Sequence, residues 1–400
     1  MTSQIGGSTI DRELATLSPW ADRAAPIGCD ERNGRLEKAR RLTRDMGADA
    51  LLIGAGDSLR YFAGMPWGQT ERLVALLLPV TGRPVMIAPA FELGSLEADL
   101  KIDADIHLWE EHESPARLVV GALGSADAGT LAVDPALPFQ AAERIRAVAP
   151  SLTLRDAAPV VDGCRSVKSP AEIALLAQAK AMTLEVQRRA ARVLAPGIRA
   201  SEVRRFIDSA HRAIGAAEGS YFCAVQFGRS TAFPHGLPVD DVLAEDDLVL
   251  IDTGCRVEGY HSDITRTYAF GRVDAEQRAI WELEQEAQAA AFAAVAPGRP
   301  CESIDATARA VLERAGLGPD YRLPGLPHRT GHGIGLSIHE PAYLVSGDTT
   351  PLTPGMCFSN EPMIVVPDRF GIRLEDHFYV TDNGAAWFTQ PSAAIDRPFA

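Results

Sequence analysis

Two aspartates at the ends of apolar runs are the first residues in this chain that indicate chemistry. Residues 248–251 (Leu-Val-Leu-Ile) predict a buried strand, because four consecutive apolar residues include two that are β-branched. Asp252 follows directly, and Asp263 stands eleven residues later in a second strand-like run. Gly254 and Gly259 lie between them and predict a turn. We therefore expect a hairpin that brings the two carboxylates together.

Two glutamates repeat this arrangement further along the chain. The run 356–380, MCFSNEPMIVVPDRFGIRLEDHFYV, again predicts two strands, and it carries Glu361 and Glu375. Each acidic run follows a helix, an Ala-Pro-Gly stop that begins at 195 or 296, and a second helix closed by glycine. Chance is the alternative, because Ala-Pro-Gly is a common helix stop. We favour an internal duplication, since the helices, the stop and the acids recur in the same order.

Four carboxylates in one buried centre repel one another and resist desolvation. They are tolerated if they are protonated, paired with arginine or bound to cations. Arg266 and Arg373 are the nearby guanidinium groups, too few for four acids. A pair of divalent cations compensates the charge best, and carboxylates commonly bridge two such ions roughly 3.5–4 Å apart. Strand alternation also places Asp263, Thr265 and Thr267 on one face.

Histidines supply the nitrogen ligand that such a centre needs. His332, in GHGIGLSIHE, stands between Gly331 and Gly333, which allow the backbone to approach a crowded site. A lone histidine beside glycine is more often a structural residue. Here His328 and His339 stand near it in the sequence, beside the acidic strands. The cluster therefore favours a metal site.

The elements that must position these residues form two predicted domains. The first part of the chain alternates helical and strand-like patterns, with apolar runs ADALLIGAG, RLVALLLPV and RPVMIAPA, and predicts an α/β domain. KSPAEIALLAQAKAMTLEVQRRAARVLAPG then opens a second unit, with Ser169 as helix N-cap and Glu172 completing a capping box. We expect an N-terminal domain over residues 1–165, with about the first 30 residues as an extension, and a second domain over 166–400.

Composition and charge narrow the possible partners and location. The net charge of −14 disfavours nucleic acid, because phosphate binding requires a clustered basic surface. No run of about 18 or more uncharged apolar residues occurs, so we expect no membrane-spanning helix. The first twenty residues lack a basic stretch followed by an apolar stretch, and so do not resemble a signal peptide. We expect a cytoplasmic protein with no membrane partner.

The order Asp252, Asp263, His332, Glu361 and Glu375 resembles the five-ligand set of the pita-bread metallopeptidases. The contexts IDTGCRVEGYHSDITRT, GHGIGLSIHEP, NEPMI and GIRLED are similar to those of the Xaa-Pro dipeptidase (prolidase) and aminopeptidase P branch. The resemblance covers nearly the whole chain, since that branch also carries a creatinase-like α/β N-terminal domain. It implies an α+β pita-bread C-terminal domain with an internal pseudo-twofold duplication, and a homodimer.

The resemblance also implies a role for each ligand. Asp252 would chelate one metal ion, whereas Asp263 and Glu375 would bridge both. His332 and Glu361 would complete the shell of the other ion. Two divalent ions per subunit are therefore expected. Oxygen-dominated ligation with one imidazole suits Mn²⁺ first, with Zn²⁺, Co²⁺ or Fe²⁺ as alternatives.

Four further residues fall at the family's spacings. His235, in FPHGLP, matches the histidine that contacts substrate, and His339 matches a histidine thought to support the tetrahedral intermediate. His328 and Arg373 also match, and we expect both to bind substrate. One position departs from the family pattern, because Val365 stands where a tyrosine hydroxyl normally lies near the metals. This departure puts in doubt any mechanism that depends on that hydroxyl.

These matches imply metal-dependent hydrolysis of the peptide bond before proline in short peptides. A hydroxide activated by the two metals would attack that bond, and Glu361 is best placed to transfer its proton to the leaving imino nitrogen. We predict a dipeptide preference, because the guanidinium of Arg373 can receive the free carboxylate of the proline through two parallel hydrogen bonds. The alternative is that Arg373 pairs with a carboxylate of the metal site.

Other functions on the same fold are the alternatives. They are Xaa-Pro aminopeptidase activity on longer peptides, ectoine-ring hydrolysis, dimethylsulfoniopropionate cleavage and a non-catalytic module that binds protein partners. The resemblance to creatinase is weaker, because that enzyme works without the metals whereas all five ligands are present here. Non-catalytic modules have typically lost metal ligands, so the intact set argues against that alternative too. Fold-level analogy does not separate the remaining functions.

Overall fold

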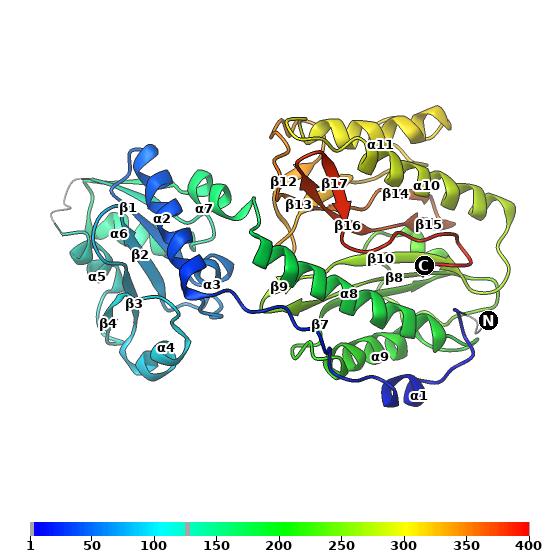
Figure 1. Ribbon diagram of the computed structural model, residues 1–400, viewed down its shortest axis with the longest axis horizontal. Coiled ribbons are helices and arrows are strands. Elements are labelled where there is room, and N and C mark those ends of the chain that lie inside the picture. Colours follow the sequence, from blue (N-terminus) through cyan, green and yellow to red (C-terminus); the bar gives the residue numbers. More distant parts are fainter. Residues whose placement is uncertain (1–3, 125–128, 400) are drawn as a thin grey trace. The chain divides into compact units, whose positions relative to one another are not determined.

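The computed structural model (Figure 1) describes residues 4–124 and 129–399, and the chain divides into two compact units. Residues 27–165 form one unit. The residues from 166 onward form the other, together with the segment that precedes residue 27. Within the described ranges, no helix is long and apolar enough to cross a membrane.

A six-stranded mixed sheet forms the centre of the unit of residues 27–165. In sheet order, its strands are β4 (Asp105–Trp109), β3 (Val85–Pro89), β2 (Ala75–Pro79), β1 (Ala50–Gly54), β5 (Gly129–Val133) and β6 (Leu152–Asp156). The helices are α2 (Cys29–Asp45), α3 (Asp57–Ala63), η1 (Ala90–Glu92), α4 (Leu93–Asp99), α5 (Pro115–Ala122), α6 (Phe139–Val148) and α7 (Ala158–Arg165). The three predicted apolar strands form β1, β2 and β3, which are buried almost throughout. The predicted α/β organisation is confirmed.

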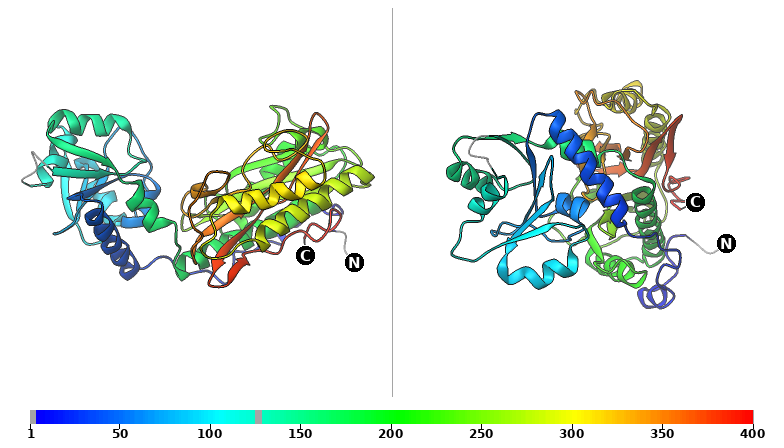
Figure 2. Two further views of the ribbon diagram at one scale, coloured as in Figure 1. Left: turned by 90° about the horizontal axis from the view of Figure 1, so that it is seen from above. Right: turned by 60° about the vertical axis from the view of Figure 1, so that its left-hand side comes forward.

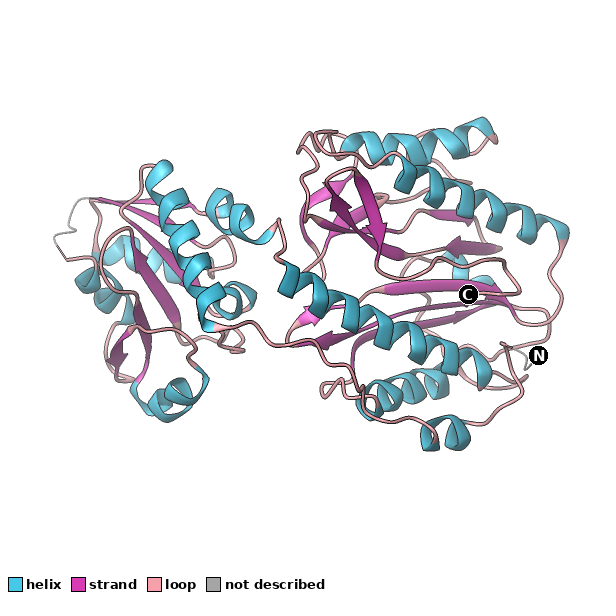
Figure 3. Cartoon of the chain, in the orientation of Figure 1, coloured by secondary structure: helices cyan, strands magenta, loops and turns pink. Residues whose placement is uncertain are grey.

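The second unit places its strands between two helix pairs, as Figure 3 shows. One pair is α8 (Pro170–Arg192) with α9 (Ala200–Ala213), and the other is α10 (Ala275–Ala293) with α11 (Glu302–Arg314). In Figure 2, α10 and α11 lie side by side along the sheets. Each helix pair is followed in the chain by a set of strands, in the order that the sequence repeat predicts.

Each half of the second unit contributes its own sheet. After the short helix α1 (Ile10–Ala15) and the first helix pair, β7 (Ser220–Phe227), η2 (Gly228–Ala232), β8 (Leu248–Val257), β9 (Tyr260–His261) and β10 (Ile264–Ala269) follow. Their sheet has the order β10-β8-β7, with β9 paired to β8. The other half supplies β11 (Gly331–Gly333), β12 (Glu340–Leu344), β13 (Cys357–Asn360), β16 (Asp376–Thr381) and β17 (Gly384–Trp387), in the order β12-β11-β13-β16-β17. Strands β14 (Met363–Val366) and β15 (Phe370–Arg373) pair separately.

The capping box predicted at Ser169 is present at the start of α8. The Ser169 hydroxyl accepts a hydrogen bond from the backbone N–H of Glu172, and the Glu172 carboxylate accepts one from the backbone N–H of Ser169. This reciprocal pair satisfies two amide groups that the first helical turn leaves without partners. Pro170 occupies the first helical position, where its missing N–H costs nothing.

The predicted hairpin around Asp252 forms, but its two glycines have different roles. Strands β8 and β10 pair antiparallel, with Asp252 opposite Thr265. The turn lies at Glu258 and Gly259, both with positive φ. The expectation that Gly254 belongs to the turn is wrong, because it lies within β8. A Cβ at Gly254 would lie 1.9 Å from the backbone carbonyl oxygen of Ser262, so the absence of a side chain permits the two backbone segments to approach closely.

The segment before residue 27 differs from the predicted domain division, which assigned it to the N-terminal domain as an extension. In the structure it belongs to the second unit. The backbone N–H of Gly6 donates to the carbonyl of Ala191, and that of Trp20 to the carbonyl of Ile214. Glu13 is buried and pairs with Arg189 at 3.2 Å. Composition could not reveal this, because the contacts join residues nearly 200 positions apart.

Candidate metal centre

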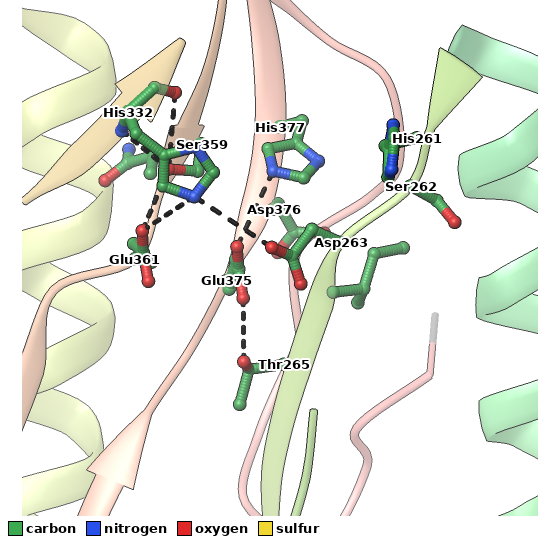
Figure 4. A network of polar contacts seen from close by, with 12 residues as sticks. His261, Ser262, Asp263, Thr265, His332, Ser359, Glu361, Glu375, Asp376 and His377 are labelled. Atoms are coloured by element: carbon green, nitrogen blue, oxygen red, sulfur yellow. Dashed lines mark hydrogen bonds and ion pairs between the residues drawn. The ribbon is translucent and has the colours of Figure 1, made fainter. Parts of the chain in front are cut away.

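The acidic centre lies where strands from both halves of the second unit meet (Figure 4). Asp252 lies within β8, and Asp263 immediately precedes β10. In the other half, Glu361 follows β13 and Glu375 lies between β15 and β16. His332 is the central residue of β11. Of these side chains, Asp263, His332 and Glu375 offer ligand atoms that all lie within 4.8 Å of one another.

All nine residues predicted for the site line one cavity of about 660 Å³. They are Asp252, Asp263, His332, Glu361, Glu375, His235, His328, His339 and Arg373. The remaining wall consists of Phe222, Pro234, Pro327, Arg329 and Ile338. The fold thus brings together residues that span more than 140 positions of the chain. A cavity of this size accommodates a small molecule such as a short peptide.

The imidazole of His332 is held in one orientation. A Cβ at Gly331 or Gly333 would lie 2.1 or 2.5 Å from a carbonyl oxygen of a neighbouring strand, which confirms that these glycines permit close backbone approach. His332 Nδ1 donates to the carbonyl of Gly333 at 3.0 Å. In the neutral imidazole, Nε2 therefore carries the lone pair. That atom lies 3.1 Å from Glu361 Oε1 and 3.9 Å from Asp263 Oδ2.

Burial and mutual repulsion raise the pKa of most acids in the centre. Burial, and next the neighbouring carboxylates, hold the pKa of Asp263 and of Glu375 well above the usual range. Burial also raises the pKa of Asp252, although the charge of Arg373 opposes it. Asp252 Oδ1, Asp263 Oδ1 and Glu375 Oε1 are buried without a hydrogen-bond partner among the described residues. The chain therefore gathers more negative charge here than its own cations compensate.

This donor set fits divalent metal ions. Each unpartnered carboxylate oxygen keeps lone pairs that a cation can accept, and the lone pair of His332 Nε2 lies among them. Carboxylate oxygens with one imidazole nitrogen are ligands that Mn²⁺, Fe²⁺, Co²⁺ and Zn²⁺ all accept. Bound cations would also remove the repulsion that raises the pKa of Asp263 and Glu375.

Glu361 differs from the other three acids. Burial raises its pKa, but in the absence of metal ions the positive charge and hydrogen bond of His332, then the charges of His328 and Arg373, outweigh burial and lower the pKa to about 2. The hydroxyl of Ser359 donates to Glu361 Oε1 at 3.1 Å and accepts the backbone N–H of His332 at 2.8 Å. The Ser359 hydroxyl thus holds Glu361 in a fixed position beside His332 on the cavity wall.

Arg373 is paired within the site. Its Nη2 donates to Asp252 Oδ2, its Nε donates to the hydroxyl of Thr265 at 3.0 Å, and its Nη1 lies 3.4 Å from the carbonyl of Pro234. Burial lowers the pKa of Arg373, but the surrounding acids outweigh it and raise the pKa. These contacts correspond to the alternative considered for Arg373, a pairing with a carboxylate of the centre.

The other three predicted histidines lie around the mouth and wall of the cavity. The ring of His339 packs edge-on against that of His332, with 4.3 Å between centroids, and burial lowers its pKa to about 4. His328 Nδ1 donates to the carbonyl of Arg329 at 2.7 Å, and its Nε2 is buried without a hydrogen-bond partner in the described chain. His235 lies on the cavity wall beyond η2.

Sequence reasoning missed Ser359 and His377, and it placed Thr265 on the face of Asp263 without assigning it a contact in the centre. Thr265 donates to Glu375 Oε2 at 2.7 Å, Ser359 contacts Glu361, and His377 lies 3.5 Å from Glu375. The signal was available for all three, because each stands two positions from a predicted ligand and residues two apart along a strand share a face. Arg329 lines the cavity without such a signal.

The replacement Val365 lies away from the cavity. It is buried in β14, opposite Gly371, among apolar side chains that include Leu326 and Met363. It is absent from the residues that line the site. Val365 therefore contributes to the apolar core beside the centre.

The fold and this site define a metallopeptidase of the pita-bread type with a creatinase-like N-terminal domain. The model of metallopeptidase family M24 matches residues 174–382, and that of the creatinase/prolidase N-terminal domain matches residues 35–167. The chain belongs to metallopeptidase family M24. Membership implies peptide substrates and the use of divalent metal ions, in agreement with the donor set of the centre.

Similar proteins cover almost the whole chain. It is 38% identical to the probable dipeptidase PepE of Mycobacterium tuberculosis, over 88% of this chain and 92% of that protein. It is 31% identical to the Xaa-Pro dipeptidase of Lactobacillus helveticus, over 88% of this chain and 96% of that protein. The crystal structure of dipeptidase PepE from Mycobacterium ulcerans matches with a TM-score of 0.85 and 36% identity, over 93% of this chain and 99% of that one.

Proposed function

We propose that the protein hydrolyses dipeptides whose second residue is proline, with two divalent ions held by Asp252, Asp263, His332, Glu361 and Glu375. The observation that carries the proposal is the buried centre of unpartnered carboxylate oxygens beside one imidazole nitrogen, on the wall of a peptide-sized cavity. The name of the Lactobacillus helveticus relative supports the substrate class. Mn²⁺ is the ion proposed first, because oxygen ligands dominate the set.

The residues of this chain divide the chemistry among them. Bound divalent ions supply Lewis acidity and lower the pKa of water. Glu361 accepts the proton of the attacking water and returns it to the leaving imino nitrogen. His339, with a pKa of about 4, is neutral at pH 7, and its N–H donates to the oxyanion that develops on the substrate. His235 and His328 line the cavity and contact the substrate.

A dipeptide places its free carboxylate in an already acidic cavity, so a cation must receive it. Arg373 is the candidate from the sequence, but its guanidinium already donates to Asp252 and Thr265. Arg329 also lines the cavity, has no ion pair within the described part of the chain, and lies 4.5 Å from the ring centroid of Tyr343. The contacts favour Arg329 as the group that remains available for the carboxylate.

The two arginines are separated by comparing Arg329→Lys and Arg373→Lys on a Xaa-Pro dipeptide and on the same peptide with its carboxylate amidated. The arginine that receives the carboxylate should lose much more kcat/KM on the free acid than on the amide, because lysine cannot form two parallel hydrogen bonds. The arginine that supports the centre should lose equally on both substrates. If each variant loses as much kcat/KM on the amide as on the free acid, neither arginine recognises the carboxylate.

The reaction itself is tested on metal-stripped protein and on protein restored with Mn²⁺. The substrates are Xaa-Pro dipeptides, Xaa-Pro tripeptides, ectoine and dimethylsulfoniopropionate. We expect turnover that depends on Mn²⁺ and is fastest on the dipeptides. Faster turnover of tripeptides would identify an Xaa-Pro aminopeptidase instead. Turnover of a small molecule alone would identify one of the other reactions on this fold, and no turnover of any substrate would favour a binding module.

The cellular setting completes the proposal. We also propose a cytoplasmic homodimer, and the family resemblance supports the dimer. Light scattering on the purified protein measures its mass directly. A mass near 43 kDa in place of about twice that value would refute the dimer, since one chain weighs 42.9 kDa.

A further inference from the structure

His377 is a buried histidine that none of the roles above uses. It lies on β16, two positions after Glu375 and directly opposite Ser359 of β13. Its exposed fraction is 0%, and both ring nitrogens lack a hydrogen-bond partner among the described residues. Burying an imidazole without a partner for its N–H costs free energy, so its presence here needs a structural or functional explanation. Figure 4 shows the ring of His377 above Glu375, with one nitrogen facing the carboxylate.

The atom that His377 faces is itself unpartnered. His377 Nε2 lies 3.5 Å from Glu375 Oε1, which is also buried without a hydrogen-bond partner in the described chain. The other oxygen, Glu375 Oε2, accepts the hydroxyl of Thr265 at 2.7 Å. The carboxylate of Glu375 therefore has one potential donor at each oxygen, on Thr265 and on His377. Hydrogen bonds from both donors would prevent the carboxylate from rotating about its last bond.

We propose that His377 is a positioning residue of the metal centre, which donates from Nε2 to Glu375 and fixes the carboxylate for the two ions. The inference rests on the proposed metal site and deepens it. A ligand role is less consistent with the geometry, because the group of converging ligand atoms includes Asp263, His332 and Glu375 but not His377. Both the neutral and the protonated imidazole carry an N–H donor, so the assignment does not depend on the charge of the ring.

Ser359 plays the corresponding part on the neighbouring strand. It stands opposite His377 in the pairing of β13 with β16, and its hydroxyl donates to Glu361 Oε1 at 3.1 Å. Two residues on adjacent strands thus each contact a different predicted ligand from the same side. Partners of this kind orient metal ligands, and their loss typically lowers metal affinity by roughly 10–100-fold. We expect the loss of the His377 donor to lower metal affinity by a factor in that range.

The test compares His377→Gln with His377→Met. Glutamine and methionine have similar length and shape, but only glutamine places an N–H donor where Nε2 stands. Mn²⁺ affinity is measured by calorimetry on metal-stripped protein, and thermal unfolding of the same protein is followed in parallel. We expect His377→Met to bind Mn²⁺ about 10–100-fold more weakly than wild type, and His377→Gln to stay within a few-fold.

His211→Met is the matched control for the loss of a buried histidine. His211 is also fully buried in the second unit, where its nitrogens contact Thr183 at 3.0 Å and Ser220 at 2.8 Å, and it is not among the residues that line the cavity. It should lower the Tm without changing the affinity for Mn²⁺. This outcome would show that the effect of His377→Met on affinity is not a general consequence of lost stability.

The outcomes separate the inference from the proposed function. If wild-type protein binds Mn²⁺ and His377→Met binds it equally well, the positioning role is refuted and the metal site stands. Equal weakening by the glutamine and methionine variants would also refute donation to Glu375, because a donor would then make no difference. If wild-type protein binds no divalent ion, the proposed metal site itself fails.

Discussion

Two buried charge clusters lie on opposite faces of the same strands in the second unit. On one face, the guanidinium of Arg266 donates to both oxygens of Asp376, at 2.7 and 3.1 Å, and both side chains are fully buried. On the other face, Asp263 and Glu375 have no arginine or lysine within ion-pair distance in the described chain. Adjacent residues of a strand point to opposite faces, so the two clusters share their backbone.

The difference between the clusters is whether the chain supplies its own counter-charge. The pair of Arg266 and Asp376 is closed, because two groups of opposite charge meet in good geometry within the protein. The acidic centre gathers four carboxylates that face a cavity, and among the described residues an arginine forms an ion pair with only one of them, Arg373 with Asp252. Burial alone therefore does not identify a functional charge. A buried charge that the chain leaves uncompensated beside a cavity does.

The largest expected effect comes from removing a carboxylate of the acidic centre. Asp263→Asn and Glu375→Gln should each lower the metal content and reduce turnover by more than roughly 10²–10³-fold, the loss typical of a single transition-state donor. The metal-free variants should be at least as stable as metal-free wild type, since the amides remove repulsion that raises the pKa of both acids. Metal analysis, turnover and urea unfolding measure these effects. Two tightly held metals with normal turnover would refute the assignment.

In the pair of Arg266 and Asp376, by contrast, removing one charged group should lower the stability of the protein. Arg266→Met leaves the carboxylate of Asp376 buried without its ion-pair partner, which costs about 3–5 kcal/mol of stability. Urea unfolding of the metal-free protein measures the loss. The double variant Arg266→Met with Asp376→Asn should recover much of it, because the remaining group is neutral. A loss of less than about 1 kcal/mol in the single variant, as for a surface ion pair, would show that the cluster is not closed in this sense.

A substitution of His339 tests whether the metal ligands of the acidic centre include this residue. It contacts His332 but lies outside the five predicted ligands. His339→Ala should keep its metals and lose mainly kcat, by roughly 10²–10³-fold, if it donates to the oxyanion. Metal analysis and steady-state kinetics on the same preparation distinguish the cases. Loss of metal would place His339 among the ligands.

Lys180 is a third buried charge, in neither cluster, and should give the smallest effect. It is fully buried, donates to the carbonyl of His261 at 3.1 Å and lies 4.8 Å from the ring of Phe388. Burial lowers its pKa to about 8; the thiol of Cys357 and the charge of Asp263 oppose that shift, whereas Lys168 adds to it. An ordinary lysine in the unfolded chain titrates near 10.4.

Between these two pKa values the unfolded state binds more protons than the native state, so the stability of wild type should rise as the pH increases from about 8 to about 10. Below pH 8 the full cost of burying the charge is present. Lys180→Met should therefore be more stable than wild type at pH 7 by roughly 3 kcal/mol, and this difference should shrink by pH 10. Urea unfolding at the two pH values measures it. A difference that is independent of pH would contradict the origin proposed here.

Local rules were sufficient for much of the fold. The capping box at Ser169 and the apolar strands β1, β2 and β3 follow from interactions between residues close in sequence or from uninterrupted apolar character. The close approach at Gly331 and Gly333 was predicted from residue type alone, because only glycine lacks a Cβ. The role of Gly254 was misjudged, since the carbonyl that crowds it comes from the far side of the hairpin.

The sequence by itself determined which residues form the acidic centre, because their types, order and contexts resemble one family and the strand period fixes which of them share a face. Tertiary structure alone decided how those residues pair. It joined Arg373 to Asp252, placed His377 beside Glu375, left Arg329 on the cavity wall, and closed the second cluster between Arg266 and Asp376. The physical reason is that alternation along a strand is local, whereas the partner across a sheet or cavity depends on which distant segments the packed core brings together.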